Sequence, residues 1–147
     1  MAASTNRMET RQHRLSITRA LQIGVLGGLL AAVGNVLLYL IAQAVLGINF
    51  IVPALPGGQL VPLTIVNVVL ASFIPGLAAG LLLYLLTRIS GEPMQIFLGI
   101  AVSILLFSFT MPMGAPGIPF DVRAVLAAMH LIAAGAIMWM VTRFWNR

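Results

Sequence analysis

The sequence predicts an all-α membrane protein, a transmembrane four-helix bundle with both termini in the cytoplasm. Three observations support this prediction. Hydrophobic residues make up 61% of the 147 residues and charged residues 7%, against about 45–50% and about 25% in soluble domains. Four long apolar stretches contain no Asp, Glu, Lys or Arg in their interiors. Of the eight arginines, all but Arg123 lie on one side of the membrane if every stretch crosses it.

Residues 1–19 are expected to form a cytoplasmic tail, and residues 20–147 a single membrane domain. The tail is polar and basic, so it serves either as a topogenic signal at the anionic headgroups or as an amphipathic surface helix. Its arginines are Arg7, Arg11, Arg14 and Arg19. Ser16 is a residue type that caps helix N-termini, which suits the entry to the first helix.

The first span is expected over residues 21–46. As a helix this uncharged run is about 39 Å long, more than the roughly 30 Å of a bilayer's hydrocarbon core. A cleaved signal peptide has a much shorter apolar region, which argues against that use.

The other spans are expected over residues 63–87, 94–111 and 122–142. The segment 88–93 between the second and third spans is short, polar and turn-forming, so these two helices should pack as an antiparallel hairpin. Pro75 predicts a kink inside the second helix.

The arginines predict the orientation of the bundle. With four crossings, both termini and the turn at residues 88–93 share one side, and Arg123 alone lies on the other side, close to Asp121. Because positive residues are retained on the cytoplasmic side, we expect a multi-pass protein of the inner (plasma) membrane with N- and C-termini cytoplasmic.

The two outer loops, residues 48–62 and 112–121, are apolar yet rich in Pro and Gly. Proline donates no backbone hydrogen bond, so neither loop is expected to be a regular lipid-exposed element. We expect them to lie over the bundle as a lid, or to dock on a partner. Phe50-x-x-Pro53 resembles Phe109-x-x-Pro112, which either a duplicated hairpin or shared loop composition would explain.

Small residues recur every four positions in the first two spans. Such rows let helix backbones approach closely in a membrane. We expect them to pack helices within one chain, with a homo-oligomer through the same faces as the alternative. The rows consist of Gly24, Gly28, Ala32, Ser72, Gly76 and Gly80.

Polar side chains within the spans fall in the outer half of the membrane or near its middle, and all four helices contribute. We expect them to meet inside the bundle beneath the outer loops. Two interpretations fit: hydrogen bonds that join helices at about 0.6 kcal/mol each, or a small polar cavity for a ligand, water or an ion. His130 is the one ionisable member. The cluster is Asn35, Tyr39, Asn67, Ser72, Ser103 and His130.

Several chemistries are excluded or disfavoured by what the spans lack. The chain has no cysteine, and one membrane histidine without nearby acids makes neither a haem site nor a typical metal site. Ser103 or Ser108 with His130 would be a dyad without an orienting acid. We therefore expect no enzymatic activity, no metal and no cofactor. The arginines form no basic stripe, so no nucleic acid is expected as a partner.

These expectations lead to two functional hypotheses. The first is a non-enzymatic accessory or scaffold subunit, surrounded by membrane lipids, that contacts a protein partner or a second copy through its helix faces or outer loops. The second is a small transporter or channel with a polar cavity in the outer half of the bundle. That cavity would be lined by Asn35, Tyr39, Asn67 and His130.

Short motifs along the chain give a resemblance that covers roughly residues 18–145. They are Gly34-Asn35 with Tyr39, Val52-Pro53, Pro75-Gly76 and Ala128-Met129-His130-Leu131. In these motifs the chain resembles a family of small bacterial four-helix membrane proteins known only as a domain of unknown function. The resemblance implies a bacterial inner-membrane protein and carries no activity, substrate or catalytic residue.

Overall fold

A computed structural model describes residues 15–53, 58–114 and 116–145, and its helices account for all four predicted spans. Each helical span is long and apolar enough to cross a membrane, with the third span formed by α3 and α4 together. The predicted tail up to residue 14 and Arg147 lie outside the described residues. The elements are α1 (Ile17–Leu46), β1 (Ile51–Pro53), β2 (Leu60–Pro62), α2 (Ile65–Ile89), α3 (Pro93–Ser108), α4 (Thr110–Gly114) and α5 (Phe120–Trp145).

Helix α1 begins four residues before the predicted span, so residues 17–19 are helical rather than part of the tail. The reason is a cap: the Ser16 hydroxyl oxygen accepts a hydrogen bond from the backbone N–H of Arg19, at 3.3 Å. The helix ends at Gly47, whose φ of +64° is left-handed, a conformation that costs glycine little. The N–H of Ile48 then donates to the carbonyl of Ala42 at 3.1 Å.

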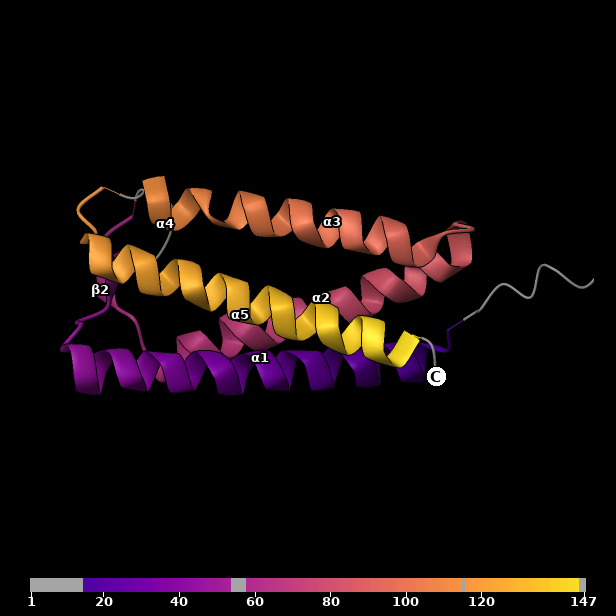
Figure 1. The fold of residues 1–147 in the computed structure, drawn as a ribbon, viewed down its shortest axis with the longest axis horizontal. Helices are drawn as coiled ribbons and strands as arrows, with labels where there is room; N and C mark the ends of the chain where they lie inside the picture. The colour runs from indigo at the N-terminus through magenta and orange to yellow at the C-terminus, as the bar shows by residue number, and fades with distance from the viewer. Residues whose placement is uncertain (1–14, 54–57, 115, 146–147) are drawn as a thin grey trace, which may run out of the picture.

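The short turn between α2 and α3 reverses the chain, as predicted, but the two helices diverge away from this turn and do not pack along their length (Figure 1). Ser90 ends α2, and its hydroxyl accepts a hydrogen bond from the N–H of Glu92 at 3.0 Å. Pro93 occupies the first turn of α3, where a missing N–H costs no helical hydrogen bond. Helix α2 is continuous from Ile65 to Ile89 and includes Pro75.

The outer loops contain more regular structure than the sequence predicted. In the first loop, β1 and β2 pair as a small antiparallel hairpin with Val52 opposite Val61. Pro53 and Pro62 flank this central pair, and in an antiparallel ladder the flanking pairs need not exchange N–H···O bonds. Proline is therefore compatible with both positions.

The second loop differs because α4 carries the chain on as a helix to Gly114. Pro112 lies within the first turn of α4, where the backbone N–H groups have no helical partner, so proline is tolerated there. The segments around Pro53 and Pro112 thus have different backbones, one extended and one helical. The two segments are similar in sequence but do not share a backbone structure.

Helix α1 is the centre of the bundle, packed against α2 on one side and α5 on another. Figure 1 shows α3 lying apart from α1, across the bundle, and shows α1 beginning where α5 ends. We call that end, which also holds the α2–α3 turn, the terminal end. The opposite end, with β1, β2 and α4, is the hairpin end.

The contact between α1 and α2 brings two backbones together at glycines. A Cβ atom placed on Gly76 would lie only 2.5 Å from the Cα of Gly28, and one on Gly24 would lie 2.7 Å from the carbonyl oxygen of Gly76. Gly80 meets the first turns of α1 in the same way. The adjacent Gly27 faces α5, with its Cβ position 3.4 Å from the Cα of Ile137.

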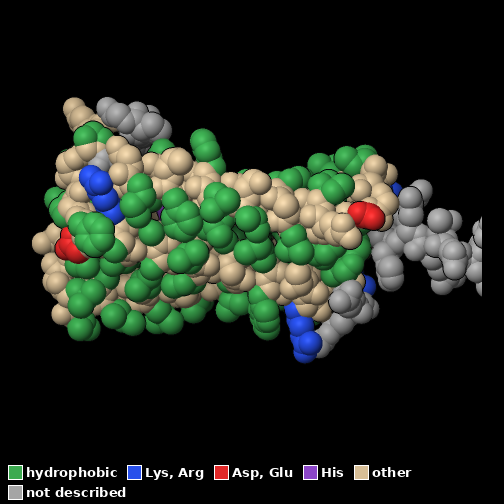
Figure 2. All heavy atoms as spheres, turned by 45° about the horizontal axis from the view of Figure 1, so that its top comes forward, with side chains coloured by type: hydrophobic (Ala, Val, Ile, Leu, Met, Phe, Trp, Pro, Cys, Tyr) green, Lys and Arg blue, Asp and Glu red, His purple; other side chains and the backbone are tan. Residues whose placement is uncertain are grey.

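The outer surface of the bundle is apolar along its length, as a lipid-facing surface must be. Figure 2 shows hydrophobic side chains over the whole visible face and charged side chains only towards its two ends. The buried side chains form two clusters, one around Leu83 and Phe97 towards the terminal end and one around Tyr39 and Phe50 towards the hairpin end.

The α1–α2 contact predicts that replacing a glycine by alanine lowers stability at this contact but not on α3. In Gly76→Ala the new methyl group overlaps the backbone of Gly28, and we expect a loss of about 1–3 kcal/mol of stability, typical of overpacking. Gly99→Ala on α3 is the matched control, because no atom lies within 4 Å of its Cβ position. Thermal unfolding in detergent checks this, and equal melting temperatures for the two variants would contradict it.

Candidate functional site

The close approach of α1 and α2 continues towards the hairpin end as a polar contact. The side-chain amide of Asn35 donates from Nδ2 to Oγ of Ser72 at 2.9 Å. The Ser72 hydroxyl in turn donates to the carbonyl of Val68, one turn earlier in α2, at 2.7 Å. Asn35 is 4% exposed and Ser72 is 2% exposed, so the contact is fully inside the bundle.

This arrangement leaves one hydrogen-bond acceptor buried without a partner. The Ser72 hydroxyl donates its proton to the carbonyl of Val68, so it can only accept a hydrogen bond from Asn35. The Nδ2 of Asn35 must therefore point towards Ser72, and its Oδ1 points away. Oδ1 of Asn35 is buried, and no described residue donates to it. A buried acceptor left unsatisfied costs about 1–3 kcal/mol, so this atom requires a donor that the described residues do not supply.

A cavity lies next to Asn35, the residue that carries this oxygen. It has a volume of about 120 Å³ and is not sealed, whereas about 10–15 Å³ is enough for one water molecule. It is bounded by α1, α2 and α5 and reaches from Asn35 to the first turn of α2 at the hairpin end. Its principal lining residues are Asn35, Asn67, Ser72, Leu126, Met129 and His130.

His130 presents a second acceptor to this space. Its Nδ1 lies 2.7 Å from the carbonyl oxygen of Leu126 in the same helix. A carbonyl only accepts, so Nδ1 carries the proton, and Nε2 of the neutral ring is an acceptor. The ring is half-buried, and its centroid lies 6.2 Å from that of Phe109.

His130 is also part of the wall of a larger cavity at the hairpin end. This second cavity measures about 560 Å³ and is bounded by the β1–β2 hairpin, α4 and the hairpin-end half of α5. Both cavities are lined by His130 and Leu126, so these two side chains separate them. The larger cavity also exposes Ser108 and Thr110, at the junction of α3 and α4.

Two predicted members of the polar cluster have other roles. The Tyr39 hydroxyl donates to the carbonyl of Leu63 at 2.7 Å and accepts from Nε2 of Gln43 at 2.9 Å. Tyr39 therefore ties α1 to the entry of α2. Ser103 is exposed on α3 and donates to the carbonyl of Gly99, one turn earlier in its own helix, at 2.9 Å.

The described structure thus brings together four of the predicted residues, Asn35, Asn67, Ser72 and His130, around one cavity. Asn67 belongs to its rim, with its Oδ1 accepting from the hydroxyl of Thr64 at 2.5 Å. Thr110 was not predicted from the sequence as part of a site. Its position depends on α4, and a loop rich in proline gives no sign of such a helix.

The more deeply buried polar groups of the cavity are hydrogen-bond acceptors, while the side-chain amide of Asn67 adds donors at the exposed rim. Oδ1 of Asn35 and Nε2 of His130 have no donor among the described residues, and no group of three His, Cys, Asp or Glu forms there that could hold a metal. Neither acceptor bears a formal charge when the imidazole is neutral. The site therefore suits a molecule with hydrogen-bond donors and no net charge.

The comparisons with known proteins give a family but no activity. The chain matches the model of a family described as a family of unknown function (DUF6069) over residues 16–147, which include every residue of both cavities. No curated protein and no solved structure matches the chain.

Proposed function

The chain belongs to the family of unknown function DUF6069, and from the geometry of its interior we propose that it binds a small neutral solute inside the membrane. Four helices apolar enough to cross a membrane make it a multi-pass membrane protein. The single observation that carries the proposal is the buried Oδ1 of Asn35, which lacks a donor beside a cavity. A bound solute would satisfy this atom.

The residues around the cavity restrict the class of solute. A cation would enter an apolar region in which none of the described residues lining the cavity is a carboxylate that could balance its charge, and burying an uncompensated charge is costly. An anion would meet two acceptor atoms and gain no hydrogen bond from them. A small alcohol, polyol, urea or amide, or water itself, offers donors without charge.

The packing of the bundle favours a carrier over an open channel. The polar cavity adjoins the larger hairpin-end cavity at His130. Towards the terminal end, the interior is filled by an apolar cluster that includes Leu83, Phe97 and Val141. A solute entering from the hairpin end therefore meets a closed interior, and its passage requires a change of conformation.

Solute flux tests this proposal directly. Purified protein in vesicles should raise the rate of glycerol or urea entry, followed by stopped-flow light scattering. His130→Leu should lower that increase about tenfold, which corresponds to the loss of roughly one hydrogen bond. Among the described residues, His130 makes a hydrogen bond only within its own helix. The substitution therefore breaks no hydrogen bond between helices.

Ser103→Ala is the matched control, because Ser103 is exposed on α3 and lies outside the cavity. It should leave the rate unchanged. Vesicles with the wild-type protein that are no more permeable to water, glycerol and urea than empty vesicles would refute the carrier proposal.

We also propose that the terminal end faces the cytoplasm of a bacterial inner membrane. Arg19, Arg88 and Arg143 belong to this end, whereas Arg123 is at the hairpin end. Arg123 has a local role there, since its guanidinium donates to the carbonyls of Ile118 and Met113 at 2.9 and 3.0 Å. The charge bias between the two ends supports the orientation.

The absence of cysteine from the sequence makes the orientation easy to test. Gln59→Cys, in the hairpin-end loop, should react with a membrane-impermeant maleimide in intact spheroplasts. Gly91→Cys, in the α2–α3 turn, should react only after the membrane is opened. Both positions are exposed, so the reverse pattern would overturn the orientation.

A second candidate function is that of a non-enzymatic accessory subunit, and the packing of α3 favours it. Phe97 is the only residue that α3 buries, and the Cβ position of Gly99 faces open space. A helix from a partner or a second copy could pack there. Within the described residues, neither cavity is lined by a carboxylate, the group that many catalytic sites use as an acid or base.

This role predicts contacts on α3 that α1 does not make. In native membranes, a crosslinker attached at Ile104→Cys should produce a species of higher mass. The same crosslinker at Leu29→Cys, an equally lipid-exposed position on α1, should not. No product at either position would argue against an accessory role through α3.

A further inference from the structure

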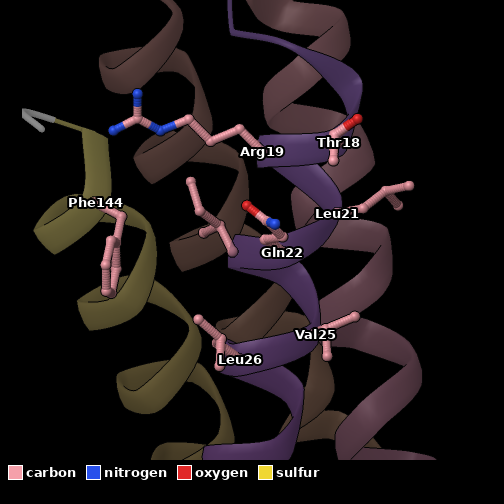
Figure 3. Close-up of a pocket in the computed structure, with 8 residues that line it drawn as sticks. Thr18, Arg19, Leu21, Gln22, Val25, Leu26 and Phe144 are labelled. Atoms are coloured by element: carbon pink, nitrogen blue, oxygen red, sulfur yellow. The ribbon is translucent and has the colours of Figure 1, made fainter.

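A groove separate from both cavities lies at the terminal end, far from the polar cavity. It follows the first turns of α1 and is closed on one side by Phe144 of α5, as Figure 3 shows. Its volume is about 560 Å³, and its lining is mainly apolar. Because it shares no residue with the proposed solute site, conclusions about this groove are independent of that proposal.

The groove is polar at its outer rim and apolar further in. Thr18, Arg19 and Gln22 lie in the first two turns of α1, and Val25 and Leu26 line the next turn. Arg19 and Leu26 are separated by about 10 Å along the helix axis. The groove therefore has a charged group at the membrane surface and apolar side chains deeper in. A phospholipid has the same order, with its headgroup at the surface and its acyl chains below.

Arg19 has a charge without a counter-charge among the described residues. Among the described residues, its backbone N–H donates to the Ser16 hydroxyl, and its side chain is exposed. In Figure 3 the Arg19 side chain extends from α1 along the top of the groove on the side of α5.

We propose that this groove binds a phospholipid with an anionic headgroup. The Arg19 guanidinium would hold a phosphate oxygen pair, a geometry for which its planar donors are suited. The side-chain amide of Gln22 supplies a further donor one turn deeper along α1. One acyl chain would lie against Val25, Leu26 and the ring of Phe144.

The apolar wall distinguishes a lipid from free phosphate. Inorganic phosphate would use Arg19 alone and leave Leu26 and Phe144 uncovered, whereas a lipid uses both parts of the groove. The unpaired positive charge also favours phosphatidylglycerol over phosphatidylcholine, whose choline group already neutralises its phosphate.

Native mass spectrometry of the full-length protein in detergent tests the proposal, with equal amounts of phosphatidylglycerol and phosphatidylcholine added. We expect preferential retention of phosphatidylglycerol. Arg19→Gln should weaken that binding about tenfold, as expected for loss of one charged hydrogen-bonding group. Leu26→Trp should reduce retention of both lipids by filling the groove.

Arg88→Gln is the matched control. Arg88 lies at the same end but stacks over the ring of Tyr84, 4.9 Å from its centroid. Equal retention of the two lipids by the wild-type protein would overturn the proposal. An equal effect of Arg88→Gln would also overturn it, because binding would then reflect diffuse charge. Competition by inorganic phosphate alone would assign the groove to free phosphate instead.

Discussion

The contact of α1 with α2 at four glycines is the constraint on which the other features depend. Lipid offers no hydrophobic drive for helices to associate, so close backbone packing must supply it. Gly24 and Gly28 meet Gly76 and Gly80 at distances that leave no room for a Cβ atom. That approach brings Ser72 within 2.9 Å of Asn35. A wider separation of the two helices would break this bond and enlarge the cavity beside it.

The same contact explains why the interior holds an unpaired acceptor. An asparagine amide has both donors and acceptors, and the single serine opposite Asn35 can satisfy only one side of it. The orphaned Oδ1 would be a plain loss of stability in a sealed core. In the solute site that we propose, a bound donor would satisfy this oxygen and recover that loss.

Packing is uneven across the bundle, and the uneven part borders the cavities. Helices α1, α2 and α5 form a close unit, while α3 buries only Phe97. The wall of the larger cavity is built from α4, the β1–β2 hairpin and the end of α3. Segments with few buried contacts open most readily. The part of the molecule best able to move is therefore the part that covers His130.

The sequence by itself determined which segments cross the membrane. Hydropathy and length are local properties, so the four spans were predictable to within a few residues, as was the turn at residues 88–93. Local chemistry also indicated the Ser16 cap. The prolines of the outer loops were a poorer guide, because proline is compatible with a flanking strand pair in β1–β2 and with the first turn of α4. These placements depend on neighbours that the local sequence does not reveal.

Only the tertiary structure decided which polar residues meet. Ser72 and Ser103 look alike in sequence, since each is a serine in an apolar helix near small residues. Their surroundings differ because α2 is held against α1 by glycines, whereas α3 stands apart, so Ser72 is buried and Ser103 is exposed. The rotation and distance of each helix are set by contacts between helices. For that reason a cavity with one unpaired oxygen could be found only in the folded bundle.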